Sequence, residues 1–217
     1  MRDEWIRWSW VADHTDDIGA ALREHVTLTV TAVALGLVLS LPLGILAAQH
    51  RRFLGPVLSL SGVLYAIPSL AAFGLLGPVT GYLSFTTALL PLTSYTLLIL
   101  IRNVVTGLGE VPEEAKDAAT GMGYGPTQRL LRVELPLALP AIVAGIRIAT
   151  VSTIALVTVA FLINRGGLGE LILDGVRRDF RTPMVVGSVL SIALAVVADL
   201  LLVGLQRLAT PWARAGR

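Results

Sequence analysis

The chain has 217 residues, of which 54% are hydrophobic and 15% are charged, and its formal net charge is +2 at pH 7. Soluble domains carry about a quarter charged residues, so the composition excludes an ordinary soluble domain, and the near-neutral charge argues against nucleic acid as a partner. Cysteine is absent, which excludes disulfides, thiolate metal ligands and a cysteine nucleophile.

Five apolar stretches are each long enough to cross a bilayer, which takes roughly 20 residues at about 1.5 Å per residue. They predict an all-α, polytopic membrane protein with spans at residues 26–48, 56–77, 82–101, 137–163 and 183–205. We therefore expect a transmembrane domain over residues 26–207, flanked by an extracytoplasmic interfacial segment over 1–25 and a cytoplasmic tail over 208–217.

The N-terminal segment lacks the signal-peptide pattern of a basic region, an apolar core and a cleavage site, so we expect the first span to be its own insertion signal. Trp5, Trp8 and Trp10 precede that span, and indole rings favour the headgroup region of a membrane. These tryptophans predict an interfacial anchor, and docking to an external protein is the alternative.

The second predicted span contains Pro68, followed by Ser69. Proline removes one backbone hydrogen bond and kinks a helix. A kink suits a transport pathway, which makes Pro68 and Ser69 pathway candidates. A packing bend with no role in gating is the alternative.

Orientation follows from the positions of Lys and Arg, because cytoplasmic loops collect them. With the N-terminus outside, nine of these residues lie in cytoplasmic segments and seven in outer segments. The difference only slightly favours an outer N-terminus and a cytoplasmic C-terminus, since the outer loop 164–182 holds four arginines.

The longest polar segment, residues 110–136, separates the third and fourth predicted spans and predicts a hairpin of two short helices. Pro112 suits a first helical position. Pro126 can begin the second helix, and we expect Pro136 to end or kink it where the fourth span begins.

One side of the first hairpin helix is predicted to be small and apolar, because helical spacing brings together Ala115, Ala118, Ala119 and Met122. Such a face lets another surface approach the backbone closely, and the glycines that follow it allow a sharp reversal. A solvated loop that only joins two spans is the alternative.

A spaced motif runs through this hairpin: Asp117-Ala118-Ala119, three residues, Gly123, nine residues, then Val133-Glu134-Leu135-Pro136. It resembles the EAA loop of the permease subunits of ABC importers, with Asp117 in place of Glu and Val133 in place of Ile. The resemblance implies that the loop is cytoplasmic and docks into a cleft of the ATP-binding subunit, which supports the outer N-terminus. The ATPase-coupling residues that it implies are Asp117, Ala118, Ala119, Gly121, Met122, Gly123, Tyr124, Leu135 and Pro136.

Two charges lie within the last two predicted spans, where charges are costly and usually face a bundle interior, a cavity or a partner. Arg147 lies about ten residues, or roughly 15 Å, from the cytoplasmic end of the fourth span, and Asp199 lies about six residues from the same side of the fifth. We hypothesise that Arg147 and Asp199 form an ion pair within the membrane. The pair could be structural or could lie on the transport path, and the alternative is that the side chains snorkel to the interface. Thr150 and Thr153 are further pathway candidates, or serve only helix association.

Residues 166–176 of the outer loop show helical apolar spacing and predict a short helix against the mouth of the pathway. The resemblance implies that this is an outer gate region. Its gate candidates are Asn164, Gly166 and Gly167.

The resemblance extends over nearly the whole chain, in phrases such as LPLGILA, AIPSLA, VELPLALPAIVAGIR, GGLG and ADLLL. These phrases are similar to permeases of the glycine betaine, carnitine and choline uptake family. The resemblance implies the transmembrane domain of a type I ABC importer, located in the plasma (inner) membrane. It implies transport of a quaternary-ammonium osmoprotectant, and a methionine-type amino-acid importer is the alternative.

The absence of an ATP-binding motif and the family resemblance together predict the protein partners of this chain. No Walker A pattern occurs, so we expect a separate cytoplasmic subunit to bind ATP and Mg and hydrolyse the ATP, and this chain to be no enzyme and to hold no cofactor. The scattered histidines predict no metal site. The other implied partners are a second copy or a homologous permease, and an extracytoplasmic solute-binding protein. A stand-alone secondary transporter is disfavoured because no internal repeat is seen.

Overall fold

The computed structural model describes residues 6–214, so Trp5 of the predicted anchor and the last three residues of the predicted tail lie outside it. Over this range the chain forms helices and connecting turns, with no strand. The predicted all-α class is confirmed.

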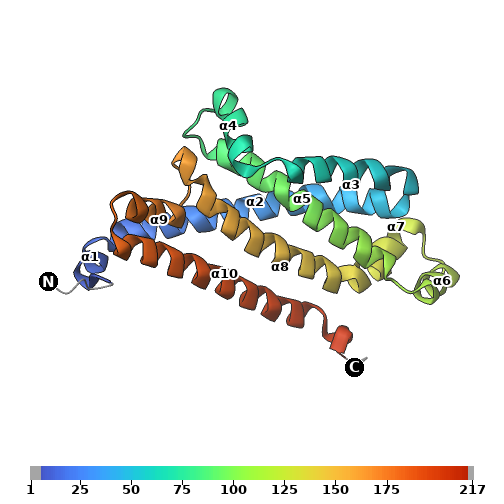
Figure 1. Ribbon diagram of the computed structural model, residues 1–217. Helices are drawn as coiled ribbons and strands as arrows, with labels where there is room; N and C mark the ends of the chain where they lie inside the picture. The colour runs from blue at the N-terminus through green and yellow to red at the C-terminus, as the bar shows by residue number, and fades with distance from the viewer. Residues whose placement is uncertain (1–5, 215–217) are drawn as a thin grey trace.

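Four long helices run side by side along the length of the molecule (Figure 1). Each is long and apolar enough to cross a membrane. They are α2 (Thr15–Gln49), α5 (Phe85–Gly109), α8 (Leu135–Val159) and α10 (Arg181–Ala209). They correspond to the first, third, fourth and fifth predicted spans, but α2 begins eleven residues earlier and α5 ends eight residues later than predicted.

The second predicted span is broken rather than kinked. It consists of α3 (Arg51–Ala66) and α4 (Ser69–Thr80), which are bent by 90°. Ile67 is extended, with ψ 123°, a conformation favoured before a proline because the proline ring disfavours helical geometry at the preceding residue. The hydroxyl of Tyr95 in α5 donates a hydrogen bond of 2.6 Å to the Ile67 carbonyl. Counted as one broken span, the pair brings the number of candidate crossings to five.

The predicted hairpin contains α6 (Glu113–Gly121) and α7 (Pro126–Arg129). A single π-turn, η1 (Leu130–Glu134), joins α7 to α8, and η2 (Ala160–Ile163) extends α8. The helix does not end at Pro136, because helical structure continues from Pro126 to Ile163. That part of the expectation is wrong. In the π-turn the N–H of Leu135 donates to the Leu130 carbonyl, which widens the helix just before the proline ring.

Short helices cover the two ends of the bundle. Figure 1 shows α1 (Trp8–Asp13), α4 and α9 (Leu168–Arg177) at one end, and the hairpin at the other. The predicted short helix of the outer loop is therefore confirmed. The last described element is η3 (Pro211–Arg214), at the hairpin end of α10.

Two apolar cores hold the bundle together, one toward each end. The first joins α2, α4, α5, α8 and η2 around buried Leu28, Phe73, Leu92 and Val157. The second joins α5 to α8 at the hairpin end, around Val104, Leu108, Val111, Ala138 and Ile142. The second core fixes the base of the hairpin to two membrane-crossing helices.

Candidate functional site

The base of the hairpin is tightly packed. Gly107 of α5 lies so close to α8 that a β-carbon there would be 2.9 Å from both the Ala138 carbonyl oxygen and the Ala141 β-carbon. Val111, at the start of the hairpin, is buried in the second core. The hairpin is thus anchored at its base and projects from the end of the bundle (Figure 1).

The small apolar face predicted for α6 is divided in the structure. Ala119 is buried, with 1% of its surface exposed, whereas Ala118 is exposed and Met122 is 66% exposed. Adjacent helical residues differ in direction by about 100°, so Ala119 packs against the protein while Ala118 faces outward. The prediction of one continuous face is therefore wrong.

An outward surface remains on the hairpin. It consists of residues that are exposed and have small or flexible side chains, apart from one carboxylate: Asp117, Ala118, Gly121, Met122 and Gly123. Tyr124, Leu135 and Pro136, the other predicted coupling residues, are half-buried behind it. We call the five exposed residues the hairpin tip.

Gly123 makes the reversal after α6. Its φ is +85°, in the left-handed region that favours glycine. Its N–H donates to the Thr120 carbonyl at 2.9 Å, and the Tyr124 N–H donates to the Ala119 carbonyl at 3.0 Å. These two bonds satisfy carbonyls at the end of α6, as in a glycine-terminated helix.

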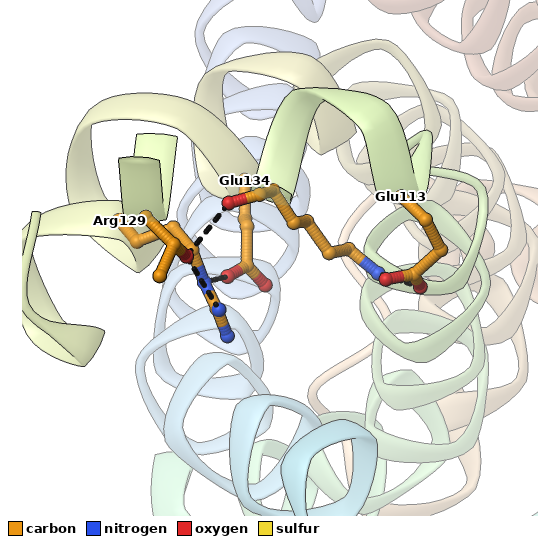
Figure 2. A network of polar contacts seen from close by, with 5 residues as sticks. Glu113, Arg129 and Glu134 are labelled. Atoms are coloured by element: carbon orange, nitrogen blue, oxygen red, sulfur yellow. Dashed lines mark hydrogen bonds and ion pairs between the residues drawn. The ribbon is translucent and has the colours of Figure 1, made fainter. Parts of the chain in front are cut away.

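Polar side chains join the two helices of the hairpin (Figure 2). Nε of Arg129 donates to Oε1 of Glu134 at 2.7 Å, and Nη1 donates to the Thr120 hydroxyl oxygen at 3.4 Å. On α6, Nζ of Lys116 donates to Oε1 of Glu113 at 2.8 Å. That hydrogen bond lowers the pKa of Glu113, and the charge of Lys116 acts in the same direction.

The Arg129–Glu134 contact was not predicted, because side chains on an α-helix meet at a spacing of three or four residues and this pair is five apart. The sequence predicts this ion pair only if residues 130–134 are assumed to form a π-turn. A cavity of about 550 Å³ lies beside the pair, between the hairpin and the turn from α2 to α3, and His50, Lys116, Arg129 and Glu134 are among its lining residues.

Arg147 and Asp199 join α8 to α10 within the bundle. Nε and Nη2 of Arg147 donate to the two carboxylate oxygens of Asp199 at 2.8 Å and 3.0 Å. This two-bond geometry is the strong form of an arginine–carboxylate pair. Both side chains are about one-third exposed in the isolated chain, at 31% and 33%.

The predicted pathway residues lie in three separate places. Pro68 and Ser69 form the break between α3 and α4. Thr150 is half-buried on α8 and donates to the Ile146 carbonyl, whereas Thr153 is 1% exposed and therefore lines no open route in the isolated chain. The remaining three candidates are in the outer loop, so the structure does not bring the seven residues into one surface.

The outer loop packs closely against α2. Asn164 and Gly167 have positive φ values of 54° and 52°. A β-carbon at Gly167 would lie 2.8 Å from the Ala21 carbonyl oxygen and from the β-carbon of His25, and one at Gly166 would lie 2.5 Å from the Phe161 nitrogen. Both glycines are therefore required for packing.

Arg165 ties this loop to other elements. Its Nε donates to the Leu83 carbonyl at 2.7 Å, and its Nη1 lies 3.3 Å from Oε1 of Glu24 in α2. The N–H of Gly166 donates to Oε1 of Glu170 at 3.3 Å. Burial raises the pKa of Glu170 and outweighs the opposing effect of that hydrogen bond.

His25 is a buried residue whose position the sequence did not reveal. It is 0% exposed in α2, directly beneath Gly167, and its Nε2 donates to the Ile154 carbonyl of α8 at 3.0 Å. A single histidine at the edge of an apolar run carries no spacing signal. Over residues 6–214, no cluster of three or more His, Asp or Glu side chains is placed to hold a metal ion.

Comparison with known proteins places most of the chain in one group. Residues 40–210 match the family described as "Binding-protein-dependent transport system inner membrane component". The chain is 35% identical over 206 residues to the osmoprotectant import permease protein OsmW of Salmonella typhimurium, covering 93% of this chain and 96% of that protein. It is 36% identical over 197 residues to the glycine betaine/carnitine/choline transport system permease protein OpuCD of Bacillus subtilis, covering 89% and 86%.

The fold also matches a solved structure. A chain of the MetNI methionine ABC transporter in inward-facing conformations superposes with a TM-score of 0.74 at 22% identity, covering 88% of this chain and 94% of that one. At this identity the match concerns the fold alone. It confirms the predicted fold.

Proposed function

Because the chain belongs to the family of binding-protein-dependent transport system inner membrane components and is the permease subunit of an ABC importer, we propose that its solute is a quaternary-ammonium osmoprotectant. The observation that carries this proposal is the similarity, over about nine-tenths of the chain, to permeases named for osmoprotectant, glycine betaine, carnitine and choline import. Methionine is the weaker candidate, because the likeness to the methionine transporter concerns the fold alone.

Uptake by a reconstituted complex tests the solute. The permease is placed in liposomes with its ATPase and its solute-binding protein, and uptake of radiolabelled glycine betaine, carnitine, choline and methionine is measured with and without Mg-ATP. We expect uptake of at least one quaternary-ammonium compound that requires both ATP and the binding protein. Uptake of methionine alone, or ATP-independent flux through the purified chain, contradicts the proposal.

The hairpin tip is proposed as the surface that docks onto a cytoplasmic ATPase. Its support is the exposure of Ala118, Met122 and Gly123, the anchoring of the hairpin base to α5 and α8, and the resemblance to the EAA loop. Small side chains allow the partner to approach the backbone of α6 closely. In this arrangement the partner supplies ATP hydrolysis, a solute-binding protein delivers solute from the other side, and a second permease chain completes the pathway.

Ala118→Trp tests the docking surface. Ala118 is exposed, so the indole is tolerated by the fold but obstructs a close-fitting partner. We expect membrane insertion to be unchanged and copurification of the ATPase to fall at least about tenfold, because the indole clashes with a close-fitting partner and a tenfold loss of affinity corresponds to only about 1.4 kcal/mol. Leu208→Trp, at an 81% exposed site at the cytoplasmic end of α10, is the matched control. Normal ATPase binding by Ala118→Trp contradicts the assignment.

A further inference from the structure

The joint between the hairpin and α8 is a π-turn rather than an α-helical turn. Residues Leu130–Glu134 form it, and they separate the short α7 from the 25-residue α8. Single π-turns inside α-helices are rare and occur frequently at functional sites. This one lies where a movement of the hairpin has to pass into a membrane-crossing helix.

An ion pair spans the joint. Arg129 precedes the π-turn and Glu134 ends it, with Nε and Oε1 2.7 Å apart. Residues five apart on a straight α-helix point about 140° away from each other, whereas the wider π-turn brings such residues to one side. The pair therefore favours the π-turn over the α-helical alternative.

Glu134 has a buried position that makes the pair costly to break. The residue is 8% exposed, and its neighbours Leu130 and Leu135 pack against the second core. A buried carboxylate needs a charged or hydrogen-bonded partner, and Arg129 is that partner. Through Nη1, Arg129 also reaches Thr120, next to the hairpin tip.

The other side of the joint is not filled. Arg129 and Glu134 both line the cavity of about 550 Å³ between the hairpin and the turn from α2 to α3. Packing against apolar side chains therefore does not fix the rotation of the hairpin on that side. The polar contacts of Arg129 with Glu134 and with Thr120 span the joint on that side, and Figure 2 shows Arg129 beside Glu134.

From this geometry we infer that Glu134 is a positioning residue for transport: acting through Arg129, it holds the π-turn and sets the rotation of the hairpin on α8. With the joint held, displacement of the hairpin by the ATPase moves α8. With the joint released, the same displacement is absorbed at residues 130–134. The inference rests on the proposed docking of the hairpin tip.

The test measures ATP hydrolysed per solute transported in the reconstituted complex. Glu134→Gln leaves the hairpin tip intact, so ATPase binding and hydrolysis are expected to persist while the ATP consumed per solute rises roughly tenfold, as for the loss of one charged hydrogen bond. The exchanged pair, Arg129→Glu with Glu134→Arg, is expected to restore the ratio. Asp13→Asn, at an exposed carboxylate on α1, is the control and leaves the ratio unchanged.

A second variant tests the same inference if Glu134→Gln folds poorly. Thr120→Val, at an exposed position, leaves the Arg129–Glu134 pair intact and removes the contact with Arg129 together with the hydroxyl's own hydrogen bond to the Lys116 carbonyl, and a smaller rise in the same ratio is expected. An unchanged ratio in both variants overturns the inference. Loss of ATPase binding in Glu134→Gln, with uptake and hydrolysis falling in proportion, also overturns it. Retention of the ATPase by Ala118→Trp instead shows failure of the docking proposal.

Discussion

Gly123 is the residue at which the hairpin depends most directly on backbone geometry. Its φ of +85° is unfavourable for a residue with a β-carbon, although open space surrounds the position. Left-handed geometry costs an ordinary residue about 1 kcal/mol or more. The reversal after α6 therefore needs glycine for its conformation and not for room.

Gly123→Ala is expected to destabilise the hairpin by about 1 kcal/mol and to reduce ATP-coupled uptake. Gly121→Ala is the matched comparison, because Gly121 ends α6 with no neighbour within 4 Å and without a positive φ. Hydrogen exchange of residues 113–125 measures the difference. Equal protection in the two variants would show that the left-handed geometry is unimportant.

Glu170 gives the outer loop a dependence on pH. Its pKa is raised in the folded protein, first by burial, so the folded state binds a proton more readily than the unfolded chain does. Stability is therefore lost as pH rises from the unfolded pKa through the folded pKa, and the loss is complete above the folded value.

Glu170→Gln should remove this dependence, since the amide oxygen still accepts a hydrogen bond from Gly166 and carries no charge. We expect the melting temperature of the variant to exceed that of the parent at neutral pH and to match it at acidic pH. Melting curves of the detergent-solubilised protein across this range provide the measurement. A higher melting temperature for the parent at neutral pH would contradict the assignment.

Among the helices, α8 and α10 are joined by the pair Arg147–Asp199, and each member alone is a charge in a membrane-crossing helix. Arg147→Met is expected to lower the yield and the melting temperature, because it leaves Asp199 unpaired in a membrane-crossing helix. The double variant Arg147→Met with Asp199→Leu should recover most of that loss. Yield of the assembled complex and its melting temperature measure both effects.

A transport role for the pair makes a different prediction. If the charges lie on the solute path, the double variant assembles but does not transport. If the pair is structural, the double variant both assembles and transports. Normal assembly and transport by Arg147→Met alone would show that the pair is unimportant.

Apolar length predicted four of the five spans, because the bilayer demands continuous apolar helices, and helical apolar spacing predicted the short helix α9. The sequence did not predict two features, the 90° break at Ile67–Pro68 and the π-turn before Pro136. A proline weakens a helix in either case, and the outcome depends on side-chain contacts that the proline itself does not specify. Tyr95 bonds the freed Ile67 carbonyl at the break, whereas Glu134 pairs with Arg129 across the turn.

The candidate site was predictable to a similar degree. Motif spacing identified the hairpin residues, and residue chemistry brought together Arg147 and Asp199, which the structure places within 2.8 Å. The sequence did not reveal which alanine faces outward, because Ala118 and Ala119 have the same chemistry and differ only in what packs behind them.

For the molecule as a whole, α1 and the hairpin lie at opposite ends of the bundle (Figure 1). We propose that the α1 end is extracytoplasmic. The chain has no cysteine, so single cysteines introduced at exposed Ser9 and Thr127 report each end separately. In right-side-out vesicles, a membrane-impermeant maleimide is expected to label Ser9→Cys directly and Thr127→Cys only after permeabilisation. The reverse pattern would invert the proposed orientation.

The length of α2 has a mechanical consequence. At 35 residues the helix is roughly 50 Å long, whereas the apolar part of a bilayer is about 30 Å thick. We therefore expect its first turn, which carries Asp16 and Asp17, to extend beyond the membrane surface, and its last residues line the cavity beside the hairpin. The single helix α2 thus extends across the membrane, so a force on its outer end displaces the residues at its other end, which line the cavity beside the hairpin.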